Sequence, residues 1–357
     1  MRRNLPLPST GRLPSYEAGP TGYGLYRLIT SLGHECGVVA PSLTPKKLGD
    51  RVKTNRRDAV SLARLSRAGE LTAVWVPDER HEAMRDLSRA RQAVKKDLQG
   101  KRQQTSSLML RLGRCYPGKK TWGPAHMKWL RSQKLEHREQ RMALEELLEG
   151  VRQEGERVER LEQAIREAVP EWSLVELVTA VQAMRGFDLI AAVGVVAETG
   201  DLSRFQNPRE LMGYLGLPPS ESSTGDSVKR GGITKAGNGR ARRILVEAAW
   251  AYRHPARVGR EKQAKVAAAP RRVREIAWKA QTRLCRRFQF LEHKGKRRTV
   301  VATAVARELA AFVWAINREV MQDRQAQRRP GLWTARVVSA LDRPTAPPLQ
   351  SISNKHS

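Results

Sequence analysis

The sequence has few cysteines, fewer acidic than basic residues, and no long apolar run. Its three cysteines, Cys36, Cys115 and Cys285, are odd in number and far apart, which excludes a disulfide framework and a cysteine-rich zinc site. His34 lies close to Cys36 but lacks a second nearby pair of ligands, so we interpret both as structural residues. No apolar stretch approaches the roughly 20 residues that span a bilayer. Residues 1–15 also lack the apolar centre of a signal peptide. We therefore expect a cytoplasmic protein without a membrane partner.

Acidic residues are strongly outnumbered. The 357 residues include 36 Asp+Glu and 66 Lys+Arg, a net charge of +30. Lys and Arg bind polyanions by releasing the counterions of phosphates, so a nucleic acid is the expected partner. Hydrophobic residues make up 40% of the chain, which is enough to bury a core.

The positive charge is concentrated in one part of the chain. Residues 225–300 contain 22 Lys+Arg and 5 Asp+Glu, more than half of the total excess. The basic clusters recur along predicted helices that also carry Trp250, Trp278 and Phe288. This pattern is typical of helices that pack on a core with one face and contact a phosphate backbone with the other. The alternative is that these are the solvated faces of an arginine-rich protein.

The first part of the sequence predicts alternating helices and strands. Residues 21–33 and 57–69 predict helices, and residues 36–40 and 71–76 predict strands. The order helix, strand, helix, strand is an α/β pattern. In the first helix, Leu25, Leu28 and Ile29 lie on one face, and in the second we expect Ala59, Leu62 and Ala63 to point inward.

Residues 78–170 are charged and predict helices, with one break around residues 115–124. In the second half, apolar residues follow alternating steps of four and three, with Gly155 and Glu162 at the weak positions. The apolar members of this series are Leu144, Leu148, Val151, Val158, Ile165 and Val169. This spacing is typical of a coiled-coil seam, and a packing face inside one globular domain is the alternative.

A third, mainly helical region covers residues 173–321. It includes two short helices joined by a turn at residues 185–187, which could be a helix-hairpin-helix unit whose turn binds a phosphate. The turn has a single glycine, Gly186, so a plain helical hairpin is the alternative. We divide the chain into a truncated first domain, a helical linker region, a C-terminal domain and a disordered tail, at residues 1–77, 78–172, 173–321 and 322–357.

Two parts of the sequence carry a resemblance to a known family. The segments YEAGPTGYGLYRL (residues 16–28) and PKKLGDRVKTNRRDAVSLARL (residues 45–65) resemble the N-terminal, RuvC-like domain of the DEDD insertion-sequence transposases, a family now described as RNA-guided recombinases. The segment PPSESSTGDSVKRGGITKAGNGRARRILVEAAWAYR (residues 218–253) resembles that family's C-terminal serine domain. The resemblance extends over residues 16–321. It implies an α/β N-terminal domain of the RuvC/RNase H-like class, incomplete here, then a mainly α region with a coiled coil and an α-helical C-terminal serine domain.

In that family four acidic residues coordinate a divalent metal, and the resemblance places Glu17 and Asp58 among them. Asn55 stands where the third acid is expected, and the first aspartate has no counterpart, because Asp50 lies outside the acid positions. We therefore expect a truncated or scrambled start and a weakened Mg²⁺ site, since an Asn carbonyl brings no negative charge. Without the resemblance, we would interpret Glu17 and Asp58 as helix-start or surface charges.

The resemblance also assigns a nucleophile. The family's pattern of a serine followed by Ser or Thr and then Gly matches Ser223, whereas Ser222 stands at a less suitable position. A serine hydroxyl needs activation by a base, a metal or nearby positive charge. Glycines at Gly225, Gly231 and Gly232 would let the backbone approach a phosphate. The basic residues that we expect to bind nucleic acid are Lys229, Arg230, Lys235, Arg240, Arg242 and Arg243. An ordinary polar turn is the alternative for this segment.

The resemblance implies a DNA recombinase that is guided by a structured RNA. Ser223 would form a covalent link to DNA, in a site completed by the acidic domain of another protomer, so a homo-oligomer, a dimer or tetramer, is expected. Two alternatives remain open. One is a catalytically inactive remnant that still binds DNA or RNA through residues 225–300, and the other is a nuclease that uses metal only.

Overall fold

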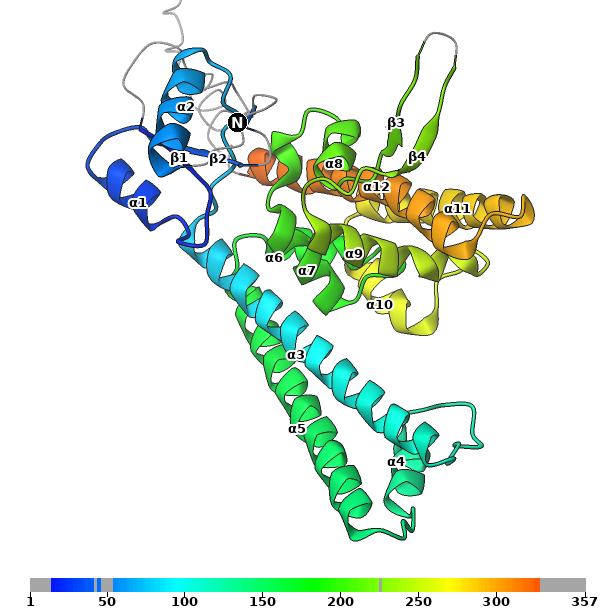
Figure 1. Ribbon diagram of the computed structural model, residues 1–357. Coiled ribbons are helices and arrows are strands. Elements are labelled where there is room, and N and C mark those ends of the chain that lie inside the picture. Colours follow the sequence, from blue (N-terminus) through cyan, green and yellow to red (C-terminus); the bar gives the residue numbers. More distant parts are fainter. Residues whose placement is uncertain (1–13, 42–43, 46–53, 225–226, 328–357) are drawn as a thin grey trace, which may run out of the picture.

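The computed structural model describes residues 14–41, 44–45, 54–224 and 227–327. Figure 1 shows three parts: a small unit with the described strands β1 and β2, a long helical hairpin, and a helical body from which a two-stranded β-hairpin stands out. The predominance of helix after residue 78 confirms the predicted mainly α region. The tail predicted from residue 322 falls partly in the last helix, and from residue 328 it lies outside the described residues.

The N-terminal unit is a short β-α-β arrangement. Strand β1 (Ser15–Glu17) pairs in parallel with β2 (Gly37–Val39), and helix α1 (Gly24–Ser31) connects them. Helix α2 (Asn55–Arg67) packs against β1. The strand predicted at residues 71–76 is reduced to an isolated antiparallel bridge between Ala73 and Val39. Within the described residues this unit combines helices with two short strands, and the RuvC-like assignment stays a prediction.

The prediction that Ala59, Leu62 and Ala63 of α2 point inward is wrong, because Ala59 and Ala63 are exposed and Leu62 is only half-buried, and the shared face of α1 is exposed as well. Leu25 and Leu28 are 52% and 57% exposed, and neither helix has a buried residue. Among the described strands and helices of this unit, β2 alone is buried throughout, with Val38 and Val39 each 1% exposed, and Leu71 after α2 is also 1% exposed. The helical period was correct, but periodicity indicates which face is apolar and does not show that anything covers it.

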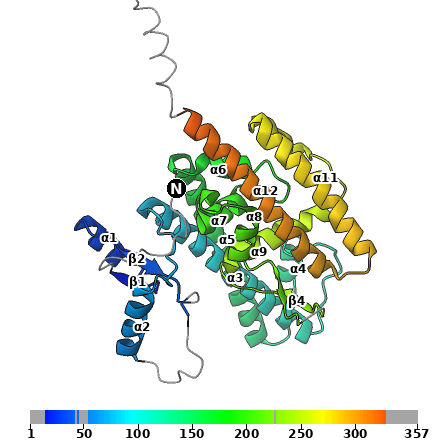
Figure 2. The same cartoon turned by 90° about the horizontal axis from the view of Figure 1, so that it is seen from above.

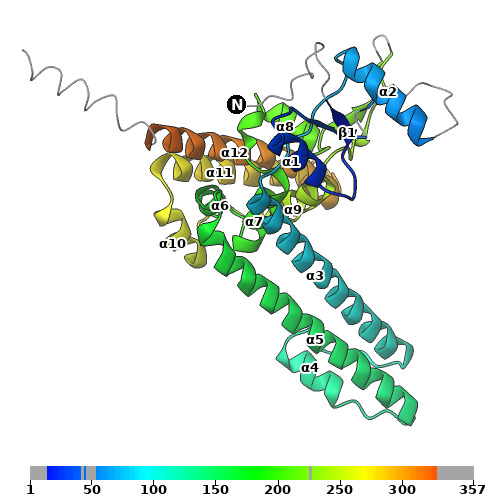
Figure 3. The ribbon, with the colours of Figure 1, turned by 90° about the vertical axis from the view of Figure 1, so that its left-hand side faces the viewer.

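Two long helices form an antiparallel hairpin that projects from the body (Figures 1 and 3). They are α3 (Glu79–Arg111) and α5 (Arg138–Ala168), with α4 (Pro124–Arg131) at the tip. At 33 residues, α3 is about 50 Å long. The predicted seam of α5 is buried against α3, where Val151 and Val158 meet Val94 and Leu98. The coiled-coil spacing therefore serves an intrachain helix pair.

Glu162, a weak position of the predicted seam, is paired across the hairpin. The Arg91 guanidinium of α3 donates to Glu162 Oε1, with Nε at 3.0 Å. Gly155, the other weak position, has open space around its Cα. A charge pair and a gap thus replace two apolar contacts, which fixes the register of the two helices.

The helical body surrounds one central helix. Its helices are α6 (Val175–Val181), α7 (Leu189–Thr199), α8 (Pro208–Tyr214), α9 (Gly239–Ala249), α10 (Arg260–Ala268), α11 (Arg271–His293) and α12 (Arg298–Gln327), with short 3-10 turns at Val169–Glu171, Leu202–Arg204 and Trp250–Arg253. Helices α6, α8, α9 and α11 pack against α12. Buried alanines and valines such as Ala302 and Val305 let these neighbours approach closely, and the buried Asn317 accepts a hydrogen bond from the Leu202 amide.

Helix α12 corrects one expectation from the sequence. Residues Arg298–Arg324 are long and apolar enough to cross a membrane by length and composition. The charged pair Arg307 and Glu308 interrupts this apolar stretch in the sequence. In the structure this helix lies in the core of the body, packed against four other helices. The cytoplasmic location stays a prediction.

Candidate functional site

The candidate nucleophile lies on a β-hairpin that stands out from the helical body (Figure 1). Strand β3 (Pro219–Glu221) pairs antiparallel with β4 (Arg230–Ile233), with Glu221 opposite Arg230. Ser220 Oγ donates to the Gly232 carbonyl at 3.0 Å. The space beside Gly231 is taken by Ser220, whereas Gly232 has open space. Gly225 lies outside the described residues.

Ser223 is exposed and is the second residue after β3. Its Oγ donates to Glu221 Oε1 at 2.9 Å, and the other carboxylate oxygen of Glu221 lies 3.3 Å from Arg230 Nε. These contacts with Ser223 and Arg230 lower the pKa of Glu221 below its ordinary value. The carboxylate therefore stays ionised at neutral pH.

Glu221 is the residue that sequence reasoning missed. A signal was present, because residues two apart in an extended segment share a face, which places Glu221 beside Ser223. The pairing of Glu221 with Arg230 depends on the register of the hairpin, and the sequence alone did not fix this register.

The predicted nucleic-acid-binding residues occupy two places. Lys229 is exposed just before β4, and Arg230 is the exposed first residue of that strand. The exposed Lys235 is the second residue after β4 and has a left-handed conformation (φ 57°). Arg240, Arg242 and Arg243 lie in α9, at the base of the hairpin.

The three arginines of α9 differ in the hydrogen bonds and ion pairs that they make within the chain. Arg242 is half-buried and donates to the carbonyls of Leu215 and Ala236 at 2.7 and 3.0 Å, so it closes the loop beneath the hairpin. Arg240 bonds Gln92 of α3, and Arg243 pairs with Glu247 at 3.5 Å. Their role in binding nucleic acid stays a prediction.

A buried polar network anchors the base of the hairpin. Asn238 caps α9 and donates to Glu198 Oε2 at 2.9 Å, and Arg89 of α3 bonds the same carboxylate through two nitrogens at 2.8 and 2.9 Å. Burial alone would raise the pKa of Glu198, but the bonds from Arg89 and Asn238 outweigh it and hold the pKa below its ordinary value. One ionised carboxylate therefore joins α3, α7 and α9.

The acidic candidates lie in the N-terminal unit. Glu17 is the exposed last residue of β1, and Asp58 is half-buried in the first turn of α2, which packs on β1. Asn55 is the exposed first residue of α2, after the cap Thr54. The carboxylates of Glu17 and Asp58 suit Mg²⁺, which takes one or two carboxylates together with waters and substrate phosphate oxygens. Among the residues that the structure describes, no three His, Cys, Asp or Glu side chains group to hold a metal.

The structure does not bring the acids and the serine together within one chain. Figures 1 and 2 place β1 and α2 on one side of the helical body and the β3–β4 hairpin on another. Each candidate group is thus presented on a separate surface.

The predicted phosphate-binding turn between α6 and α7 is occupied by the protein itself. Gly186 has φ +87°, and a Cβ there would lie 2.4 Å from the Ala248 carbonyl oxygen of α9. Lys262 Nζ donates to the carbonyls of Gln182 and Met184, both at 2.7 Å, and to that of Phe187. The geometry favours the plain helical hairpin.

Comparison with known proteins identifies the class. Residues 178–263, which include Ser223 and all of the predicted basic residues, match the family model described as "Transposase IS116/IS110/IS902 family". A protein of Sinorhizobium fredii named as a transposase, y4qE, is 59% identical over 307 residues, which cover 86% of this chain and 75% of that protein. The transposase for insertion sequence element IS1533 of Leptospira borgpetersenii is 32% identical over 285 residues, 79% of this chain and 82% of that protein.

These matches define a protein of the transposase class. More narrowly, the chain belongs to the IS116/IS110/IS902 family of insertion-sequence transposases. The match of residues 178–263 runs from α6 into α10 and leaves out the acidic residues of the N-terminal unit.

Proposed function

We propose that this chain is a DNA recombinase of an insertion sequence, which cuts and rejoins DNA through Ser223 with a divalent metal and a structured guide RNA. The observation that carries the proposal is the setting of the serine. Ser223 is exposed on a protruding hairpin, its Oγ donates to the ionised Glu221, and Lys229 and Arg230 lie on the same hairpin. Nucleophile, proton acceptor and cations for a phosphate are thus gathered in a few residues.

The proposed reaction is a transesterification. Ser223 Oγ attacks a DNA phosphorus, a phosphoserine bond forms, and one phosphodiester P–O bond breaks. The serine proton passes to Glu221, and the leaving deoxyribose oxygen takes up a proton. Because the number of phosphoester bonds is conserved, the reverse attack of a DNA hydroxyl on the phosphoserine rejoins a strand without another reactant. The cations of Lys229 and Arg230 would stabilise the charge that develops on the phosphate oxygens.

Glu17 and Asp58 are the residues that would hold Mg²⁺. When bound, the metal would stabilise charge on phosphate oxygens or lower the pKa of an attacking hydroxyl. Since the acids and the hairpin lie on separate surfaces of one chain, we propose that the acids of one protomer meet the serine of another, in a homo-oligomer.

The test is covalent capture of DNA. The protein is incubated with donor DNA, target DNA and its cognate RNA with Mg²⁺, and protein–DNA adducts are separated on a denaturing gel. Ser223→Ala should abolish the adducts, whereas the matched control Ser222→Ala should retain them. Omission of RNA, or addition of EDTA, should also prevent them. Adducts that persist in Ser223→Ala would overturn the serine assignment.

One observation favours a second function, that of an inactive protein that binds DNA or RNA without cutting. Asn55, at the start of α2, stands one helical turn before Asp58, where the resemblance expects an acid. A neutral amide adds no charge to hold a cation. Binding of nucleic acid without adducts in the wild type would support this function, and appearance of adducts in Asn55→Asp would locate the defect in the acidic unit.

A further inference from the structure

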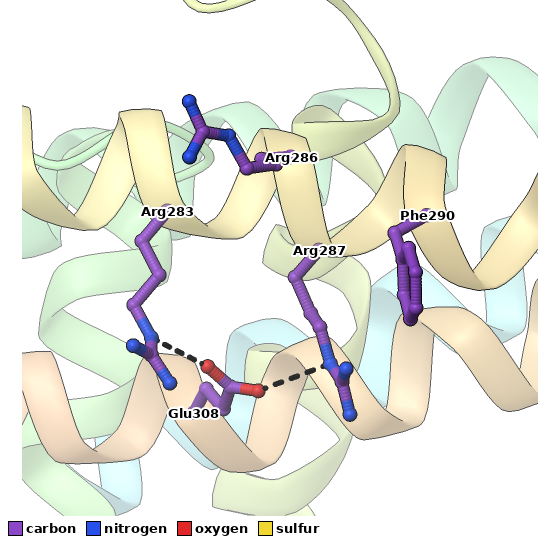
Figure 4. A pocket seen from close by; sticks show the side chains of 5 residues that line it. All are labelled: Arg283, Arg286, Arg287, Phe290 and Glu308. Carbon is purple, nitrogen blue, oxygen red and sulfur yellow. Dashed lines mark hydrogen bonds and ion pairs between the residues drawn. The ribbon is translucent and has the colours of Figure 1, made fainter.

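A basic cavity lies between α11 and α12, formed by residues outside the predicted serine and metal sites. This cavity is open to solvent, with a volume of about 390 Å³. Figure 4 shows its lining, which consists of Arg283, Arg286, Arg287 and Phe290 from α11 and Glu308 from α12. Figures 1 and 2 place the β3–β4 hairpin nearer to the α11–α12 connection than to the other end of α12.

The cavity keeps an excess of positive charge. Glu308 is shared by two arginines, with Arg283 Nε at 2.8 Å and Arg287 Nε at 3.4 Å (Figure 4). Arg283 Nε donates a hydrogen bond to Glu308, whereas the contact of Arg287 Nε is an ion pair only, and among the described residues the terminal nitrogens of both arginines have no hydrogen-bond partner. Arg286 is exposed at the rim. Two guanidinium groups thus share one carboxylate, and their terminal nitrogens remain open to an anion. The guanidinium of Arg286 points away from Glu308 (Figure 4).

An aromatic ring completes the cavity. Phe290 is 47% exposed, whereas Phe288, two residues earlier on the same helix, is fully buried. The Phe290 ring is therefore not part of the hydrophobic core. The Lys294 ammonium lies 4.6 Å and the Arg287 guanidinium 5.9 Å from its centroid, so cations flank an accessible aromatic surface.

We propose that this cavity binds an unpaired nucleotide of a single-stranded nucleic acid. The base would stack on Phe290, and its phosphates would be held by Arg283, Arg286 and Arg287. Stacking on an aromatic ring requires a base with a free face, which an unpaired strand offers and a regular duplex does not. The proposal rests on the nucleic-acid binding of the proposed function and adds a contact separate from the serine. Its chemistry suits DNA and RNA strands, so the test includes both.

The test measures binding by the full-length protein. Labelled oligo(dT), oligo(rU) and a DNA duplex of equal length are titrated by fluorescence anisotropy. Phe290→Leu should weaken binding of at least one single strand about tenfold and leave the duplex unchanged. The double variant Arg283→Gln with Arg286→Gln should reduce the slope of log K against log salt by about 1.4 on that strand.

Matched controls lie on the same helix. Trp278, 50% exposed and outside the cavity, gives Trp278→Leu, and Arg271, whose side chain is 85% exposed, gives Arg271→Gln. Both should bind like the wild type, and circular dichroism checks the fold of every variant. Equal losses in Phe290→Leu and Trp278→Leu, or no loss in Phe290→Leu, would overturn the inference alone. A wild type that binds no nucleic acid would overturn it together with the proposed function.

Discussion

Ser223 differs from the serines around it by its partner. Ser220 Oγ donates to a backbone carbonyl, which is no base, whereas Ser223 Oγ donates to the carboxylate of Glu221. A carboxylate two residues away on the same extended face can take a proton without any rearrangement of the backbone. The hydrogen bond from Ser223 and the contact with Arg230 lower the pKa of Glu221, so this carboxylate is ionised and would hold a transferred proton only weakly.

His81 is a buried group whose protonation should affect the stability of the protein. It is 1% exposed, and its Nε2 lies 2.8 Å from the Ala197 carbonyl oxygen. Burial lowers the pKa of His81 to about 4. The unfolded chain takes up the proton near pH 6.5, but the folded protein does so only near pH 4. Folding is therefore favoured above pH 6.5, and this advantage is lost as the pH falls toward 4.

We predict that this histidine contributes about 3 kcal/mol to the fall in unfolding free energy between pH 6.5 and 4. Chemical denaturation at a series of pH values measures it. In His81→Gln, which keeps a donor for the carbonyl, the pH dependence should flatten by about this amount. The exposed His34 provides the control His34→Gln, which should follow the wild-type profile. Equal profiles for wild type and His81→Gln would contradict the buried neutral state.

These residues show what the sequence can and cannot reveal about the candidate site. The motif around Ser223 and the basic residues after it were recognisable from their order in the chain. The partner of the serine was missed, because the pairing of Glu221 with Arg230 depends on strand register. Asn238, Glu198 and Arg89 come from three separate helices, and only folding brings them together.

The helices of the protein were more predictable than the surfaces that they bury. The seam of α5 predicted its buried face correctly, because a long run of apolar residues at the right spacing needs a partner along its whole length. The short helices α1 and α2 have similar apolar faces that stay open. Whether another element covers these faces depends on tertiary contacts, which a local sequence pattern does not contain.

The turn between α6 and α7 is held against α9, and we predict that it tolerates no side chain. In Gly186→Ala, the positive φ and the 2.4 Å approach of a Cβ to the Ala248 carbonyl should together destabilise the protein by about 2–4 kcal/mol. Gly295 is the matched control, since it has φ +70° but open space. Gly295→Ala should cost only about 1 kcal/mol, for the backbone alone. Thermal denaturation measures both, and equal losses would contradict close packing at Gly186.

Paired and unpaired positive charges lie on different elements of the protein. Helix α5 carries arginines that are paired with its own glutamates, such as Arg152 with Glu149 and Glu156, and Arg157 with Glu154. On the β3–β4 hairpin and just after it, Lys229 and Lys235 are exposed. The positions of unpaired positive charges therefore indicate where a polyanion would bind better than the net charge of +30 does. A phosphate backbone binds at such positions, because each phosphate that is neutralised releases counterions.

We predict that duplex DNA binding is steeply salt-dependent, with affinity falling about a thousandfold between 50 and 200 mM salt, as expected for at least about six phosphate contacts. Removing two charges from the hairpin, in Lys229→Gln with Lys235→Gln, should make the slope of log K against log salt shallower by about 1.8. The control Arg152→Gln with Arg157→Gln removes the same number of charges from α5, where they are paired. It lowers the net charge equally and should leave the slope unchanged. If both variants change the slope equally, total charge governs binding and the hairpin has no special role.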